Sequence, residues 1–125
     1  MDERSSVITL AGQEYELLLT TAATKAISKR YGGLEKLGEK LEQNDKFDDA
    51  LNEIVWLIAL LANQPINIWN LWHPEEQKAP LTPEMVELLT TPFEIAEYKD
   101  AITEAMYNGA KRYIKSEEIK NREAE

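Results

Sequence analysis

The sequence predicts a single, mainly helical α+β domain in which an N-terminal β-hairpin packs on a bundle of about five helices. Apolar and polar residues alternate near the N-terminus, as in a half-buried strand, and from residue 20 onward apolar residues recur at helical spacing. The length of 125 residues fits one domain, 1–125, and a hydrophobic content of 43% is enough for a core. Residues 1–5 and 115–125 are expected to be flexible termini.

The hairpin is expected to have strands at 7–10 and 13–19. Ala11-Gly12 forms the turn between them, because glycine adopts a positive φ without strain. The side chains expected on the buried face are Ile8, Leu10, Tyr15, Leu17 and Leu19. An isolated two-stranded hairpin is marginal in water, so this one has to pack on helices.

Two helices are expected between residues 20 and 41. The first follows Thr20-Thr21, which offers an N-cap, and ends at Gly32-Gly33, because glycine adopts the left-handed C-cap conformation most easily. The second helix covers 34–41 and is weakened by Gly38.

The central helix is expected over 47–63, with Asp45 as its N-cap and Pro65 ending it. It is apolar on nearly every side, which is typical of the middle helix of a bundle. Its main apolar stripe contains Leu51, Ile54, Val55, Ile58, Leu61 and Ala62.

Two further helices begin with threonine followed by proline. Thr82 and Thr91 are expected to cap them, and Glu94 completes a capping box with Thr91. The apolar face of the last helix is expected to hold Ile95, Tyr98, Ile102, Ala105 or Met106, Gly109 and Tyr113. This helix is expected to fray after Ile114.

Composition excludes several classes of function. The chain has no cysteine and one histidine, which excludes disulfides, Cys–His dyads and multi-histidine metal sites. A net charge of −9 disfavours nucleic acid and anionic membranes as partners, because both carry dense negative charge. The N-terminus does not match a secretory signal, and the longest apolar run, 54–62, is shorter than the roughly 20 residues that span a bilayer. We therefore expect a cytoplasmic protein that uses no cofactor or metal.

Residues that could act in catalysis form no known motif. A Ser-His-Asp triad would have to use His73, and no serine lies in a Gly-x-Ser-x-Gly sequence. Neighbouring carboxylates, such as Glu75-Glu76, point in different directions on a helix and do not form an acid–base pair by themselves. We expect no enzyme, with His73 at a helix end. An enzyme that uses tyrosine or carboxylates around His73 is the least favoured alternative.

The segment 66–73 is short, apolar and rich in tryptophan. Its side chains can seal the end of the bundle, or they can form a partner-binding patch, because tryptophan is enriched in interface hot spots. The candidate partner-binding residues are Ile66, Ile68, Trp69, Leu71 and Trp72.

The order of the elements forms a pattern. The pattern begins with a strand, a glycine turn, a polar pair, a tyrosine and a second strand. A threonine-led helix follows, and then an aromatic-glycine stop with a leucine-rich helix. An apolar central helix and a loop with a short helix complete it. These features lie at 8–17, 20–27, 31–37, 54–62 and 81–89. In this order, and with the small size and acidity, the chain resembles the tail assembly chaperones of long-tailed bacteriophages and prophages. The resemblance covers roughly 7–114 and fails at 66–73.

The resemblance implies a non-enzymatic chaperone of phage tail morphogenesis. Such chaperones bind the long, helical tape-measure protein, keep it soluble and help recruit tail-tube subunits. They act in the host cytoplasm and are absent from the mature virion. The alternative is an acidic helical prophage regulator or inhibitor that acts by protein–protein binding, for example by mimicking nucleic acid.

Overall fold

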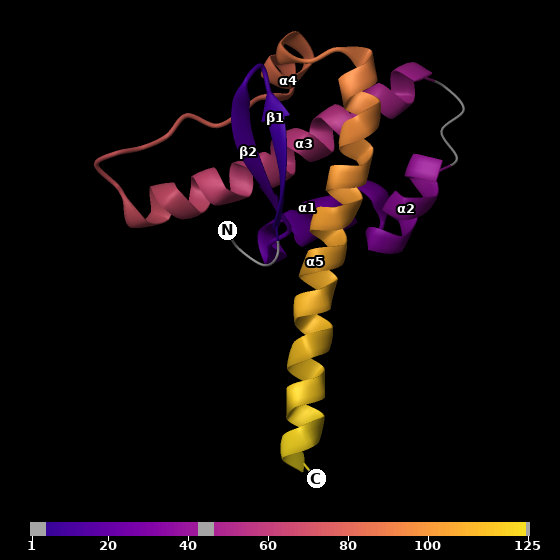
Figure 1. Ribbon diagram of the computed structural model, residues 1–125, viewed down its shortest axis with the longest axis vertical. Helices are drawn as coiled ribbons and strands as arrows, with labels where there is room; N and C mark the ends of the chain where they lie inside the picture. The colour runs from indigo at the N-terminus through magenta and orange to yellow at the C-terminus, as the bar shows by residue number, and fades with distance from the viewer. Residues whose placement is uncertain (1–4, 43–46, 125) are drawn as a thin grey trace.

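The computed structural model describes residues 5–42 and 47–124 and has the expected mainly helical α+β architecture (Figure 1). Its elements, in chain order, are β1 (Ser5–Leu10), β2 (Gln13–Leu18), α1 (Thr21–Tyr31), α2 (Leu34–Glu42), α3 (Phe47–Trp72), α4 (Pro83–Leu89) and α5 (Pro92–Ala124). The two strands form one antiparallel sheet. β1 packs on α5 and β2 packs mainly on α3, so helices support the hairpin as expected.

The hairpin has the predicted turn. Residues 5–10 pair with 13–18, and the turn residues Ala11 and Gly12 have φ angles of 49° and 84°. The residues expected on its buried face include four that are buried, Ile8, Leu10, Leu17 and Leu19. Leu18, which points to the other side of β2, is buried as well, so the alternation ends before the strand does.

Capping sets the bounds of α1. The Thr20 hydroxyl accepts a hydrogen bond from the Ala23 N–H at 3.0 Å, and Gly32 ends the helix with φ 90°. The same hydroxyl donates to Gln64 Oε1 at 2.7 Å, which joins the start of α1 to α3. Gln64 is buried and its amide donates to the Leu60 carbonyl at 2.9 Å, so both ends of this side-chain amide are paired.

The prediction that Pro65 ends the central helix is wrong. α3 continues through Pro65 to Trp72. Proline inside a helix removes one N–H and crowds the carbonyl four residues earlier, at a cost of about 3 kcal/mol. The helix persists because its residues before Pro65 are core residues and those after it are held by the returning chain, as described below. The predicted N-cap Asp45 lies outside the described residues.

The middle of α3 forms the centre of the core, as expected for a helix that is apolar on most sides. Its buried side chains belong to one core cluster that includes residues from every other element. The largest fully buried side chains are Leu10, Leu17, Leu18, Ile27, Leu37, Leu57, Ile58, Leu61, Val86 and Ile102.

Both predicted threonine caps are confirmed. The Thr82 hydroxyl accepts from the Met85 N–H at 3.1 Å, and Thr91 and Glu94 form a reciprocal capping box at 3.2 and 3.3 Å. The last helix, which is expected to fray after Ile114, continues as α5 to Ala124 in the structure. Residues 115–124 contain no proline or glycine and many strong helix formers. The C-terminal half of α5 extends beyond the other elements (Figure 1). The flexibility expected for the two termini stays a prediction.

Polar side chains fix α5 against β1. Hydrogen bonds run from the Tyr98 hydroxyl to the Thr9 carbonyl (2.6 Å), from the Ser6 hydroxyl to the Ala101 carbonyl (2.6 Å) and from Asn108 Nδ2 to the Ser5 carbonyl (2.9 Å). Two of these bonds end on backbone carbonyls of β1, those of Thr9 and Ser5. Together the three bonds fix the position of the helix along the strand.

Candidate partner-binding surfaces

The residues predicted to bind a partner lie at the C-terminal end of α3. Residues 66–72 form its last two turns, and the chain returns alongside them over 73–81. We call residues 66–81 the α3 arm. In Figure 1 the arm extends beyond the hairpin, on the side of the molecule away from α2. Its outer side is therefore available to another molecule.

Trp69 holds the arm together. Its ring stacks on the His73 imidazole with centroids 3.6 Å apart, and Lys78 Nζ lies 4.1 Å from the ring centroid. The Trp69 Nε1–H donates to the Glu76 carbonyl at 2.8 Å. His73 Nδ1 donates to the Trp69 carbonyl at 2.9 Å, and Gln77 donates to the His73 carbonyl at 2.9 Å. Because its ring and its N–H are engaged, Trp69 acts in packing, which agrees with the sealing interpretation of this residue.

Two asparagines of α3 hold the returning chain. Asn63 bonds the N–H and the carbonyl of Leu81 at 2.7 and 2.8 Å, and Asn70 bonds those of Lys78 at 2.7 and 3.0 Å. The asparagines are two helical turns apart, about 10 Å, and three residues of extended chain cover nearly the same length. Each asparagine side-chain amide thus pairs with backbone groups of the extended segment, which has no neighbouring strand to pair with them. Leu81 is buried, so the returning chain ends in the core.

Among the predicted partner-binding residues, Leu71 and Trp72 are the most exposed to solvent. Their exposed fractions are 72% and 73%, whereas Ile68 is 37% exposed and Ile66 is half-buried. Ile68, Leu71 and Trp72 have the spacing of one helical stripe, and we call them the arm surface. The structure therefore divides the predicted set into residues that build the arm and residues that it presents to solvent.

A second exposed apolar surface lies on α4 and the first turn of α5. Met85, Leu88 and Leu89 of α4 are exposed, as is Phe93 of α5, with fractions of 78% for Leu88 and 85% for Phe93. None of these residues is among those predicted from the sequence to bind a partner, and Val86 is the apolar residue of α4 that the structure buries. The sequence contains a signal for this surface. Four of the 7 residues of α4 are apolar, and they cover more of the helix than one packing contact can bury.

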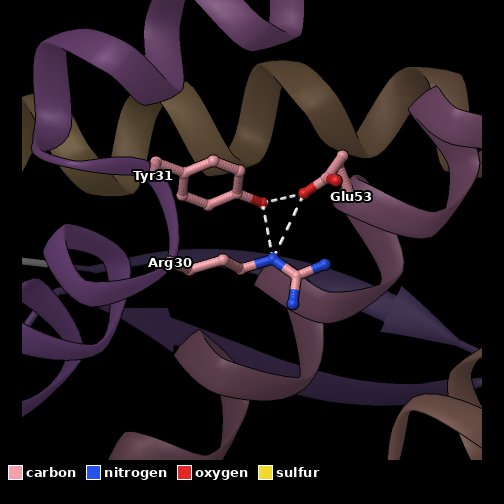
Figure 2. A network of polar contacts seen from close by, with 3 residues as sticks. All are labelled: Arg30, Tyr31 and Glu53. Carbon is pink, nitrogen blue, oxygen red and sulfur yellow. Dashed lines mark hydrogen bonds and ion pairs between the residues drawn. The ribbon is translucent and has the colours of Figure 1, made fainter.

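A polar cluster joins α1 to α3 (Figure 2). Arg30 Nε lies 3.3 Å from both Glu53 Oε2 and the Tyr31 hydroxyl, and that hydroxyl donates to the same carboxylate. The Trp56 ring lies 4.5 Å from the Arg30 guanidinium carbon and meets the Tyr31 ring edge-on. Burial and the hydrogen bond to Glu53 raise the pKa of Tyr31 above its ordinary value, so the hydroxyl stays protonated and is a poor nucleophile. The cluster ties two helices together.

The described part of the chain holds no group of three or more histidine, aspartate or glutamate side chains that could bind a metal ion. His73, which the enzyme alternative requires, stacks on Trp69 at the end of α3 and so occupies the expected helix-end position. The expected absence of catalysis and of cofactors stays a prediction.

α3 has the length and composition of a membrane-spanning helix. The segment Asp49–Trp72 has 24 residues, and an 18-residue window within it has a mean hydropathy of 1.3. Core helices of soluble proteins share these properties, and residues 54–62 of α3 are at the centre of the core. In this fold, packing explains the apolar composition of residues 54–62, and 44% of the apolar window is buried.

Comparison with protein-family models, with curated proteins and with solved structures gives no match for this chain. The function is therefore inferred from the chemistry of the arm surface and of the second exposed surface.

Proposed function

We propose that this protein is a non-enzymatic chaperone of phage tail assembly, which binds an apolar helical segment of a tape-measure protein on the α3 arm and helps to recruit tail-tube subunits. The observation that carries the proposal is the exposure of Leu71 and Trp72, 72% and 73%, at the end of the core helix. The choice of partner comes from the order of elements, which resembles that of the tail assembly chaperones.

Exposed tryptophan and leucine favour binding to an apolar partner. Burying apolar surface contributes roughly 25 cal/mol per Å², and tryptophan is among the residues that dominate interface energetics. The arm surface is small, with three side chains. A small surface suits a chaperone, because its client has to be released when the tail tube assembles.

The arm is also preorganised for binding. The bonds from Asn63 and Asn70 to the returning chain, together with the stacking of Trp69 on His73, hold the last turns of α3 in place. A helix that is already ordered loses less conformational entropy when a partner binds. The net charge of −9 adds repulsion between copies, which keeps an exposed apolar surface from self-association.

The test is co-expression with the tape-measure protein of the same phage or prophage genome. Wild-type protein should keep the tape-measure protein in the soluble fraction, and the double variant L71S/W72S should lose most of this effect. The matched control is Tyr107→Ser, which removes another exposed aromatic residue, on α5. A tape-measure protein that stays insoluble with the wild type contradicts the proposal. Equal solubility with L71S/W72S contradicts the role of the arm.

The acidic inhibitor is the second candidate, and it requires carboxylates collected on one exposed face. The exposed acidic side chains of the described residues are distributed over β2, α2, the start of α3, the α3 arm, α4 and α5. Lysines are interspersed with them on α2, where Lys36 and Lys40 are exposed. This distribution supports the inhibitor less than the chaperone.

A further inference from the structure

We propose that Met85, Leu88, Leu89 and Phe93, which we call the α4–α5 surface, form a docking site for a basic amphipathic helix of a partner protein. This site is separate from the α3 arm and goes beyond the proposed function, because it specifies the chemistry of a second partner segment. Two observations carry the proposal: the arrangement of the apolar side chains and the charge of the surrounding residues.

The apolar side chains form a continuous stripe. Met85, Leu88 and Leu89 have the i, i+3, i+4 spacing of one helical face, and the buried Val86 lies at the edge of that face. α4 and the start of α5 lie at the same end of the molecule (Figure 1), and Phe93 belongs to the first turn of α5. Both helices begin with a threonine cap, so the surface is built on ordered elements.

A separate groove lies where α3, α4 and α5 meet, and no residue of the α4–α5 surface lines it. Its volume is about 420 Å³, and its walls include Leu51 and Val55 of α3 and Pro92 and Ile95 of α5. Pockets of this size hold small ligands, but the groove faces a different side of α4 from the stripe and is not part of the docking site. Glu87 also lines the groove, so a negative charge lies beside the apolar walls.

The charge around the surface has one sign. Between Lys78 and Lys99 there is no lysine or arginine, and the acidic residues in this stretch are Glu84, Glu87, Glu94 and Glu97. Glu84, Glu87 and Glu97 are exposed, and Asp100 and Glu104 follow on the exposed side of α5. An apolar stripe bordered by carboxylates complements a helix with apolar anchors and flanking lysine or arginine. A second copy of this acidic chain would meet repulsion at the same place.

The test uses a fluorescently labelled synthetic helix of leucine and lysine, about five turns long, with binding followed by anisotropy. Two peptides serve as comparisons: a leucine–glutamate helix of the same pattern and a scrambled leucine–lysine peptide. The wild-type protein should bind the leucine–lysine helix most tightly. The double variant L88S/F93S should weaken this binding at least about tenfold, as loss of two hot-spot side chains does.

Two further variants separate the contributions. Tyr107→Ser removes an exposed aromatic side chain elsewhere on α5 and should leave peptide affinity within about twofold, because distant sites act independently. E84Q/E87Q should weaken binding and reduce its dependence on salt, because attraction between exposed charges is screened. Thermal unfolding of each variant checks that the fold is intact.

Unchanged affinity in L88S/F93S would overturn the proposal, as would equal binding of the lysine and glutamate helices. Equal binding of the scrambled peptide would reduce the interaction to attraction between net charges and would overturn it too. The assay contains no tape-measure protein, so its result is independent of the co-expression test.

Discussion

Two parts of α3 have similar compositions and opposite surroundings. Residues 54–62 are almost all buried beneath β2, α4 and α5, whereas residues 66–72 present Leu71 and Trp72 to solvent. The first part is surrounded by other elements, and the second is covered on one side by the chain at 73–81. Apolar composition therefore indicates a helix that needs cover, and the tertiary neighbours decide which part remains for a partner.

The largest difference between the two parts should appear in stability. Ile58→Ala removes a fully buried side chain and should lower the free energy of unfolding by about 2–5 kcal/mol, because it leaves a cavity in the core. Leu71→Ala should change it by less than about 0.5 kcal/mol, because the side chain is in solvent. Denaturant unfolding of both variants measures the contrast. Equal destabilisation would mean that the arm is packed in solution.

The two asparagines that hold the returning chain should contribute unequally to stability, and Asn63 should contribute more than Asn70. Asn63→Ala leaves the partly buried N–H and carbonyl of Leu81 unpaired, and should cost about 1–3 kcal/mol. Asn70→Ala exposes the backbone of Lys78 to water, which replaces the lost bonds, so the cost should be below about 1 kcal/mol. The free energies of unfolding test the order, and a larger effect of Asn70→Ala would contradict it.

Alkaline pH should weaken the contacts that Tyr98 makes between α5 and β1 and that Tyr31 makes between α1 and α3, and it should leave the arm unaffected. Burial, followed by the hydrogen bond to Glu94, raises the pKa of Tyr98 to about 12 from 10.0, and the pKa of Tyr31 is raised as well. A raised tyrosine pKa means that the folded state binds the proton more tightly than the unfolded state. The stability it contributes is therefore complete below pH 10 and is lost as the pH rises from about 10 to about 12.

This pH dependence is measurable by unfolding at several alkaline pH values. Tyr98→Phe should make the decline shallower, because the group that titrates is absent. The arm at 66–81 contains no tyrosine, so Trp69→Phe should leave the slope unchanged. A slope that Tyr98→Phe does not alter would contradict the role assigned to its hydroxyl.

The smallest effect on stability is expected for L71S/W72S. Both side chains are mostly exposed, so the free energy of unfolding should stay within about 0.5 kcal/mol of the wild type. Retained stability with lost binding would identify the arm surface as a site for a partner. A loss above about 2 kcal/mol would show that these residues pack internally.

Local chemistry made most of the elements predictable. The Ala11-Gly12 turn, the Thr20, Thr82 and Thr91 caps and the Gly32 stop each depend on a few neighbouring residues. The course of α3 through Pro65 could not be read in this way, because Asn63 and Asn70 bond residues 81 and 78, which lie far along the chain. The known cost of proline inside a helix can be read from the neighbouring sequence, but these bonds to residues 78 and 81 cannot.

The candidate site was predictable in part for the same reason. Its tryptophan-rich composition drew attention to 66–73, but composition could not separate Trp69, which is engaged, from Trp72, which is exposed. That distinction depends on the path of the returning chain. The α4–α5 surface was missed because the spacing of Met85, Leu88 and Leu89 is the same for a buried and an exposed face.

Backbone hydrogen exchange of this protein, with and without the tape-measure protein of the same genome, tests the central claim most directly. The free protein should exchange faster at 66–81 than at 54–62, because exposed segments open locally more often and core helices open only with global unfolding. Binding should slow exchange within 66–81. Protection that arises elsewhere while 66–81 is unchanged would contradict the account.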